Sequence, residues 1–218
     1  NNKKPILDIP NDTCVVANKT LIKTIKATDA DGDVLELDVF SGIVPPAVYT
    51  VNDLTTSPEG IFTWTPTCAD VRKAPYQVVF KASDAPSINP SLVDIKTWNI
   101  TVNGPKVENV IPSEVTSPTS GIQLNWDLYS CSNASKINIY RKECTSTVSK
   151  SVCLETTLEQ MGYELIFSAP VNTTSYTDVK ISNGQQYCYV LQAEFPLPKG
   201  GISYSSDEVC LVAGKTYP

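Results

Sequence analysis

The chain has 218 residues, 41% of them hydrophobic, and a formal net charge of −6, so it can form one large or two ordinary domains with a buried core. The acidic balance disfavours nucleic acid and anionic membranes as partners, because both need clustered Lys and Arg. The sequence has no apolar run of about 18 residues, so we expect no membrane insertion in this segment. It begins without Met, and we expect it to be a piece of a longer protein.

Strand-forming residues dominate the first half of the chain and are separated by turn signals. The expected strands are residues 5–9, 20–28, 34–40, 60–66, 76–84 and 92–102. In YQVVFKA, Tyr76, Val78, Phe80 and Ala82 alternate with polar residues, apart from Val79. A period of two is typical of a strand with one buried face.

The pattern breaks in NGPKVENVIP, residues 103–112, where Gly104-Pro105 favours a linker. A second set of expected strands follows, at residues 121–128, 136–142, 163–170, 174–179, 185–195 and 202–212. Six or more short strands in about 100 residues are typical of a β-sandwich. The sequence therefore predicts an all-β fold with two tandem β-sandwich domains, 1–104 and 105–218.

Seven cysteines and no histidine occur together. Zinc sites usually recruit His or closely paired Cys, and no C-x-x-C is present. Scattered cysteines in a strand-rich sequence instead predict disulfides and an oxidising compartment. Because the count is odd, at least one cysteine is unpaired or paired between chains.

Two disulfides follow from position in the sequence. If residues 185–195 and 202–212 form a hairpin around Lys199, Cys188 lies opposite Cys210 with Cα atoms about 4.5–5.5 Å apart, which suits a disulfide. Cys14 and Cys68 are the only cysteines of the first half, so we expect them to pair.

Cys131, Cys144 and Cys153 compete for one further bond. We expect it to involve Cys153, because this residue lies in the insertion at residues 142–160 that most needs tethering. Proximity in sequence favours Cys144 as its partner.

Several motifs resemble known families. The first half resembles a cadherin-like, immunoglobulin-like module of bacterial surface proteins, through ATDADGD (27–33), GIFTWTP, YQVVFKASD and WNITV. The second half resembles a fibronectin type III domain, through LNW (124–126), INIYR (137–141) and NGQQYCYVLQA (183–193), and in this resemblance Tyr187 is the tyrosine corner. FTWTPTCADVRKAPYQVVFKASD followed by YCYV and DEVC is similar to large Bacteroidota proteins associated with gliding motility and exported by the type 9 secretion system. This resemblance implies a secreted or cell-surface location at the outer face of the outer membrane, and it favours Cys131 as the partner of Cys153.

The resemblance to cadherin repeats also implies a calcium site. Asp29, Asp31 and Asp84 match the positions that bind calcium at the junction with a preceding repeat, and Asn2 is the nearest equivalent of a linker ligand. The linker acid of that family is missing here. Calcium requires six to eight oxygen ligands, so these side chains alone would start a site without completing it.

The residues themselves offer a second interpretation of ATDADGD. Asp31-Gly32 is a hairpin-turn signal, and the flanking acids would then simply be solvated. Both interpretations can hold at once. An EF-hand is excluded, because counting from Asp29 places Val34 and Phe40 where Gly and Glu are required.

The chain offers little for catalysis, since without histidine no Ser–His or Cys–His pair can form. We therefore expect no enzyme, but a structural or adhesive segment that extends a large surface protein and presents its other domains. The alternative is a recognition module that binds a glycan or a protein through the insertion at residues 141–163, which is either functional or tied down. Tyr49, Trp98 and Tyr204 are candidates for a carbohydrate-binding face, although sandwich core or edge positions are the favoured assignment.

Overall fold

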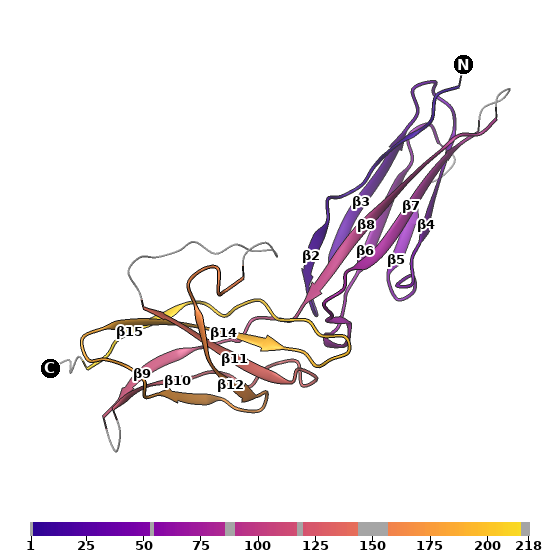
Figure 1. The fold of residues 1–218 in the computed structure, drawn as a ribbon. Helices are drawn as coiled ribbons and strands as arrows, with labels where there is room; N and C mark the ends of the chain where they lie inside the picture. The colour runs from indigo at the N-terminus through magenta and orange to yellow at the C-terminus, as the bar shows by residue number, and fades with distance from the viewer. Residues whose placement is uncertain (1, 53–54, 86–89, 117–119, 144–156, 215–218) are drawn as a thin grey trace. The chain divides into compact units, whose positions relative to one another are not determined.

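The computed structural model describes residues 2–52, 55–85, 90–116, 120–143 and 157–214 (Figure 1). The chain divides into two compact units. Unit 1 consists of Asn1–Asp70 and Ala74–Val102, and unit 2 consists of Val71–Lys73 and Asn103–Pro218. No helix long and apolar enough to cross a bilayer occurs in the described part of the chain.

Unit 1 contains two four-stranded sheets. The first has the order β1 (Ile6–Asp8), β3 (Leu21–Thr28), β6 (Glu59–Trp64) and β5 (Val48–Val51). The second has the order β2 (Thr13–Val16), β8 (Val93–Asn103), β7 (Tyr76–Asp84) and β4 (Leu35–Phe40), and a 3-10 turn, η1, covers Cys68–Asp70.

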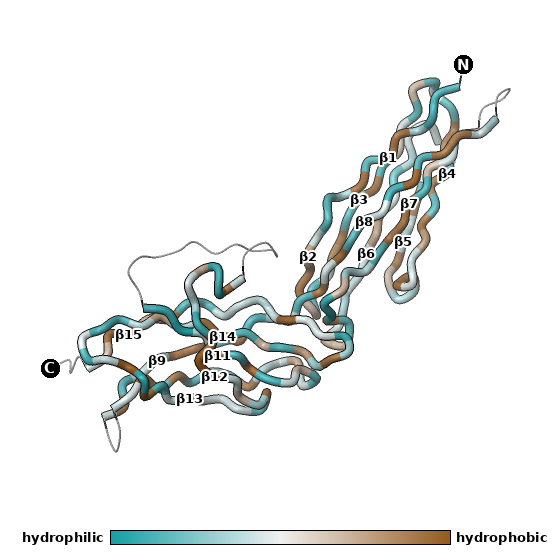
Figure 2. Tube along the Cα trace, viewed as in Figure 1, coloured by the Kyte–Doolittle hydropathy of each residue, from teal (hydrophilic) through white to brown (hydrophobic). Residues whose placement is uncertain are grey.

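The core of unit 1 is formed by the inward positions of these strands. Val78, Phe80 and Ala82 of β7 are all fully buried, as the period of two predicts. The rings of Phe62 and Trp98 meet edge to face between the sheets, with centroids 5.4 Å apart. Figure 2 shows the alternation of hydrophobic and hydrophilic residues along the strands.

Unit 2 contains a three-stranded and a four-stranded sheet. The smaller has the order β13 (Ser175–Asp178), β10 (Gly121–Asn125) and β9 (Ile111–Val115). The larger has the order β12 (Glu164–Pro170), β11 (Lys136–Glu143), β14 (Gln186–Glu194) and β15 (Val209–Val212).

Tyr187 of β14 forms the tyrosine corner that the fibronectin resemblance implies. Its hydroxyl accepts a hydrogen bond from the backbone N–H of Ser182, five residues upstream, at 3.0 Å. The bond ties the loop before β14 to the strand itself and supplies a partner for a buried phenol.

Both faces of β11 and β14 are covered. Ile137, Ile139 and Leu191 point into the sandwich and are fully buried. On the opposite face, Tyr140 and Val190 are also buried, because Leu158, Met161 and Tyr163 pack over them. The described end of the insertion is therefore tied down on the sheet surface.

The expected strands differ from the observed ones in two respects. Strands β2, β5 and β9 were not expected, and each is an edge strand of four or five residues. The strand expected over residues 202–212 contracts to β15, Val209–Val212. Upstream of β15, side chains supplement the backbone bonds to β14. The N–H groups of Ser206 and Ser203 still donate to the carbonyls of Leu191 and Ala193. The N–H groups of Leu191 and Ala193 donate instead to Ser206 Oγ and Ser203 Oγ, at 2.9 and 2.8 Å.

Candidate functional site

Three aspartates gather in the connection between β3 and β4. One carboxylate oxygen from each of Asp29, Asp31 and Asp33 lies within 4.8 Å of the others. Asp29 Oδ1 builds the connection by accepting the N–H of Asp31 at 2.7 Å and that of Asp33 at 3.4 Å. Gly32 has a φ of 77°, a left-handed conformation that favours glycine.

This connection is a turn, but not the hairpin turn that Asp31-Gly32 suggested. Strands β3 and β4 belong to different sheets of unit 1, so the segment carries the chain from one sheet to the other. Local sequence could not distinguish the two cases, because the same turn residues serve both.

Asp84, at the end of β7, is also at this edge, but its oxygens are occupied. Its side chain is buried, with 3% exposure for the residue. Oδ1 accepts the N–H of Leu92 at 2.6 Å, and Oδ2 accepts the Asn2 side-chain amide at 2.9 Å. Asn2 also donates to the carbonyl of Pro90, at 3.2 Å. The structure thus uses Asn2 as a hydrogen-bond donor to Asp84.

Lys3 neutralises Asp31. Its backbone N–H donates to Asp31 Oδ2 at 2.7 Å, and its ammonium lies 3.4 Å from Oδ1. The backbone hydrogen bond, with the ammonium charge, lowers the pKa of Asp31 despite some desolvation. The segment before β1 therefore supplies donors and a positive charge to this edge.

Asp33 was absent from the predicted ligand set, although it is the third aspartate at alternate positions. Desolvation raises the pKa of Asp33, and the charges of Asp29, Asp84 and Asp31 raise it further. Asp29 Oδ2 is buried and has no hydrogen-bond partner among the described residues. Carboxylate oxygens are ligands that calcium accepts, so Asp29 and Asp33 are the side chains here with oxygens left to offer.

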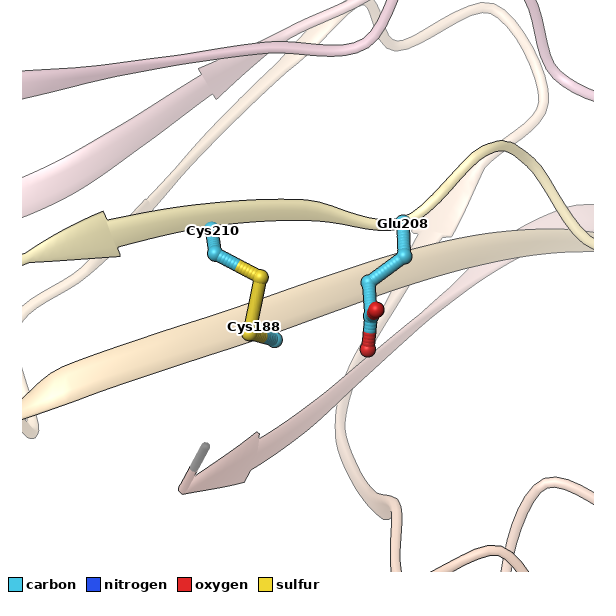
Figure 3. A group of neighbouring side chains, drawn as sticks. All are labelled: Cys188, Glu208 and Cys210. Carbon is cyan, nitrogen blue, oxygen red and sulfur yellow. A yellow bond between two sulfur atoms is a disulfide. The ribbon is translucent and has the colours of Figure 1, made fainter. Parts of the chain in front are cut away.

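A second group of reactive side chains lies on the outer face of β11, β14 and β15. Cys188 and Cys210 are opposite one another in the register predicted from the sequence and form a disulfide with a Cα–Cα distance of 4.1 Å. Ligand atoms of Cys188, Cys210 and Glu208 all lie within 4.8 Å of one another. Figure 3 shows Glu208 and Cys210 projecting in the same direction, across β14. We call these three residues the sulfur–carboxylate cluster.

Two side chains hold Glu208 in place beside the sulfurs. The Lys142 ammonium lies 2.7 Å from Glu208 Oε1, and the Lys142 side chain is only 8% exposed. The Tyr163 hydroxyl also donates to Oε1, and the Lys142 ammonium lies 4.4 Å from the centre of the Tyr163 ring. Burial raises the pKa of Tyr163, and its contact with Glu208 raises it further.

The predictions about the other disulfides are tested only in part. Cys14, Cys68 and Cys131 are disulfide-bonded, and none of the cysteines in the described ranges is free. The pairing of Cys14 with Cys68 stays a prediction. Cys144 and Cys153 lie outside the described residues, so the choice of partner for Cys153 also stays a prediction.

The aromatic residues considered for a carbohydrate face do not form one. Trp98 is fully buried, and its indole N–H donates to the carbonyl of Asn11 at 3.0 Å. Tyr49 and Tyr204 are half-buried, and the Tyr49 ring packs on Phe80 at 5.7 Å. Trp98 therefore has the core role that the sequence favoured.

No protein-family profile matches the sequence, and no curated protein matches it. Among solved structures, a two-domain fibronectin type III segment of chicken tenascin has 10% identity and a TM-score of 0.46, covering 98% of this chain and 100% of that segment. A titin fragment has 16% identity and a TM-score of 0.36, covering 96% of this chain and 66% of that fragment. The SrpA adhesin of Streptococcus sanguinis has 11% identity and a TM-score of 0.39, covering 56% of this chain and 86% of that adhesin.

The predicted fold class is confirmed. In the described residues the chain is all-β, and each of its two units is a β-sandwich of two sheets. Identities and TM-scores of this size carry no information about what the chain binds.

Proposed function

We propose that this chain is a non-catalytic structural or adhesive segment of a large secreted or cell-surface protein, in which it extends and presents other modules. The observation that carries the proposal is that the buried charged side chains are bonded to other parts of the chain. Asp84 is bonded to Asn2, and Asp94 to Lys4 and Leu7. Arg141 of β11 is bonded to Asp178 of β13, at 2.9 Å. Each of these charges joins chain segments that are distant in sequence, so these polar groups hold the fold together and are not left for catalysis.

The disulfides support an extracellular or surface location, because such bonds persist in oxidising compartments. The finer assignment rests on the sequence resemblance: a Bacteroidota protein associated with gliding motility and exported by the type 9 secretion system to the outer face of the outer membrane. The partners we propose are the other domains of the same protein, together with a surface protein or glycan if the segment is adhesive.

The test of the spacer role is replacement within the full-length protein. An unrelated pair of β-sandwich domains of similar length should preserve display and function of the flanking modules if this segment only extends them. Loss of function after replacement, with normal export, would contradict the spacer role and favour recognition by the segment itself.

The alternative, recognition through residues 141–163, is tested by exchanging residues 144–156 for a short Gly-Ser linker. Residues 157–163 must be retained, because Leu158 and Tyr163 are part of the sheet surface. Binding of the isolated chain to glycan arrays and to surface-protein extracts, lost on this exchange, would support the recognition module. The spacer role predicts no saturable binding before or after it.

For the aspartate edge we propose weak calcium binding in this chain. Of the predicted ligands, Asp84 is occupied by Asn2 and Leu92, and Asp31 by Lys3. A cation would have to displace the Lys3 ammonium and obtain most of its ligands from water or another module, because calcium takes six to eight oxygens.

A further inference from the structure

We propose that the sulfur–carboxylate cluster is a thiol-gated binding site for a borderline-soft divalent cation such as Zn²⁺. In the oxidised chain, Cys188 and Cys210 form the disulfide. After reduction, their two thiolates and the Glu208 carboxylate supply three protein ligands for a metal ion, with a fourth position open to solvent.

The geometry is already close to that of a metal site. The three ligand groups lie within 4.8 Å of one another (Figure 3). Two thiolates bound about 2.3 Å from a tetrahedral metal are about 3.8 Å apart. Cysteines in opposite register, with Cα atoms 4.1 Å apart, can reach this separation by rotation of their side chains. No rearrangement of the strands is needed.

The donor set suits Zn²⁺. Thiolates favour Zn²⁺ over Ca²⁺ and Mg²⁺, which prefer oxygen ligands. Three protein ligands with an open fourth position are typical of zinc sites that bind a further ligand. The Tyr163 hydroxyl and the Lys142 ammonium, which both contact Glu208, keep its carboxylate beside the sulfurs. A metal ion has to displace the Lys142 ammonium from that carboxylate, which it contacts at 2.7 Å.

The two halves of the disulfide differ in exposure. Cys210 is exposed and lies on β15, an edge strand, whereas Cys188 is buried. The thiolate of a dithiol reductant attacks Cys210 Sγ, and the S–S electron pair leaves on Cys188 Sγ. The second thiol of the reductant then releases Cys210, and the reductant becomes a cyclic disulfide. Binding of Zn²⁺ to the two resulting thiols releases two protons.

The surrounding structure can hold the site when the disulfide is open. Segment 203–206 is fastened to β14 by the hydrogen bonds of Leu191 and Ala193 to the Ser206 and Ser203 hydroxyls. On the other side of Glu208, β15 pairs with β14 over Gln186–Tyr189. The backbone around the three ligands is therefore fixed independently of the S–S bond.

The experiment uses the full chain, reduced without denaturant by a phosphine, desalted without oxygen and titrated with Co²⁺ as a spectroscopic probe for Zn²⁺. The wild type is compared with Glu208→Gln, with the double variant C188S/C210S, and with Glu143→Gln, an exposed acid on β11, as the matched control. The remaining cysteines are present in all four proteins and give a common background. Circular dichroism of the oxidised proteins establishes that Glu208→Gln and Glu143→Gln fold.

We expect the reduced wild type and Glu143→Gln to show a thiolate-to-cobalt charge-transfer band and tetrahedral visible bands that Zn²⁺ abolishes. The double variant should lack the bands that come from Cys188 and Cys210. Glu208→Gln should bind Co²⁺ at least about tenfold more weakly, because losing even a group that only hydrogen-bonds to a metal ligand weakens metal binding about tenfold or more. Equal binding by Glu208→Gln, or an unchanged spectrum in the double variant, would overturn the proposal. So would a Cys188–Cys210 bond that alkylation and mass spectrometry find reduced only after the chain unfolds.

Discussion

The carboxylate of Asp94 fixes the start of β1 to the opposite sheet of unit 1. Asp94 of β8 is 8% exposed. Its Oδ1 accepts the Lys4 ammonium at 2.8 Å, and its Oδ2 accepts the N–H of Leu7 at 3.0 Å. Because β1 and β8 belong to different sheets, this carboxylate closes one edge of the sandwich.

Replacing Asp94 by Asn should therefore destabilise the chain and change its response to acid. Burial opposes ionisation, but the hydrogen bonds from Lys4 and Leu7 outweigh it and lower the pKa of Asp94. Its contribution is then fully present above the unfolded pKa of about 3.9 and is lost as the pH falls through the lower folded value. We expect Asp94→Asn to cost about 1–3 kcal/mol at pH 7 and less at strongly acidic pH.

Urea unfolding of both proteins at neutral and at acidic pH measures this difference. The control is Asp38→Asn, which removes a half-exposed pair with Lys81 at 3.4 Å and should cost about 0–1 kcal/mol. A cost for Asp94→Asn that did not shrink in acid would show that its charge is not what stabilises the edge.

At the scale of elements, unit 2 depends on how β14 meets its neighbours. β15 has four residues and pairs only with β14. The disulfide joins the two strands directly, and upstream of β15 both the backbone and the hydroxyl groups of Ser203 and Ser206 are hydrogen-bonded to β14. On the other side, β11 separates β14 from the edge strand β12.

Removal of the disulfide should lower the stability of unit 2. The two cysteines are 22 residues apart, and a loop of this size restricts the unfolded chain enough to contribute about 3 kcal/mol. We expect C188S/C210S to unfold at a lower denaturant concentration than the oxidised wild type, with a free energy of unfolding lower by about 3 kcal/mol. Tyrosine fluorescence during guanidinium unfolding measures it, and a loss below about 0.5 kcal/mol would indicate strain or a structured unfolded state.

The packing of residues 157–163 on β11 and β14 is tested by Leu158→Ala. Leu158 is 7% exposed and packs in the cluster with Tyr140, Tyr163 and Val190, so we expect a cost of about 2–4 kcal/mol. The matched control is Leu165→Ala on β12, where the side chain is 46% exposed and the cost should stay within about 0.5 kcal/mol. Equal effects in a thermal melt would mean that residues 157–163 do not pack on the sheet in solution.

At the scale of the whole molecule, the two units carry different kinds of potential metal ligands. Unit 1 has a cluster of aspartates at the end where Asn2 and Lys3 lie. Unit 2 has the sulfur–carboxylate cluster on its larger sheet. Oxygen-rich and sulfur-containing sites select different cations, so metal binding at one unit can be measured independently of the other.

Calcium should hardly change the thermal stability of this chain. If the dissociation constant is near millimolar, millimolar calcium adds only about 0.4 kcal/mol. Melts recorded with calcium and with chelator should nearly coincide. A rise in melting temperature of about 10 °C or more, abolished by Asp31→Asn, would instead show a site completed within this chain.

The sequence by itself determined the fold class, because a strand with one buried face shows its period of two locally. Phe62 and Trp64, and Val78 and Phe80, are buried as their alternation predicts. The Cys188–Cys210 register was also predictable, since a hairpin centred on a Pro/Gly segment fixes which residues are opposite. The edge strands β2, β5 and β9 escaped prediction, because short edge strands have few inward positions to show a pattern.

Only the tertiary structure decided what the polar side chains do. Asn2 bonds to Asp84 across 82 positions, and Tyr163 to Glu208 across 45. The assignment of β3 and β4 to different sheets made the aspartate segment an inter-sheet turn. Likewise, the packing of Leu158 and Tyr163 on β11 and β14 fixed the described end of the insertion to the sheet. These contacts form when strands distant in sequence become neighbours, and no local period records which side chains then meet.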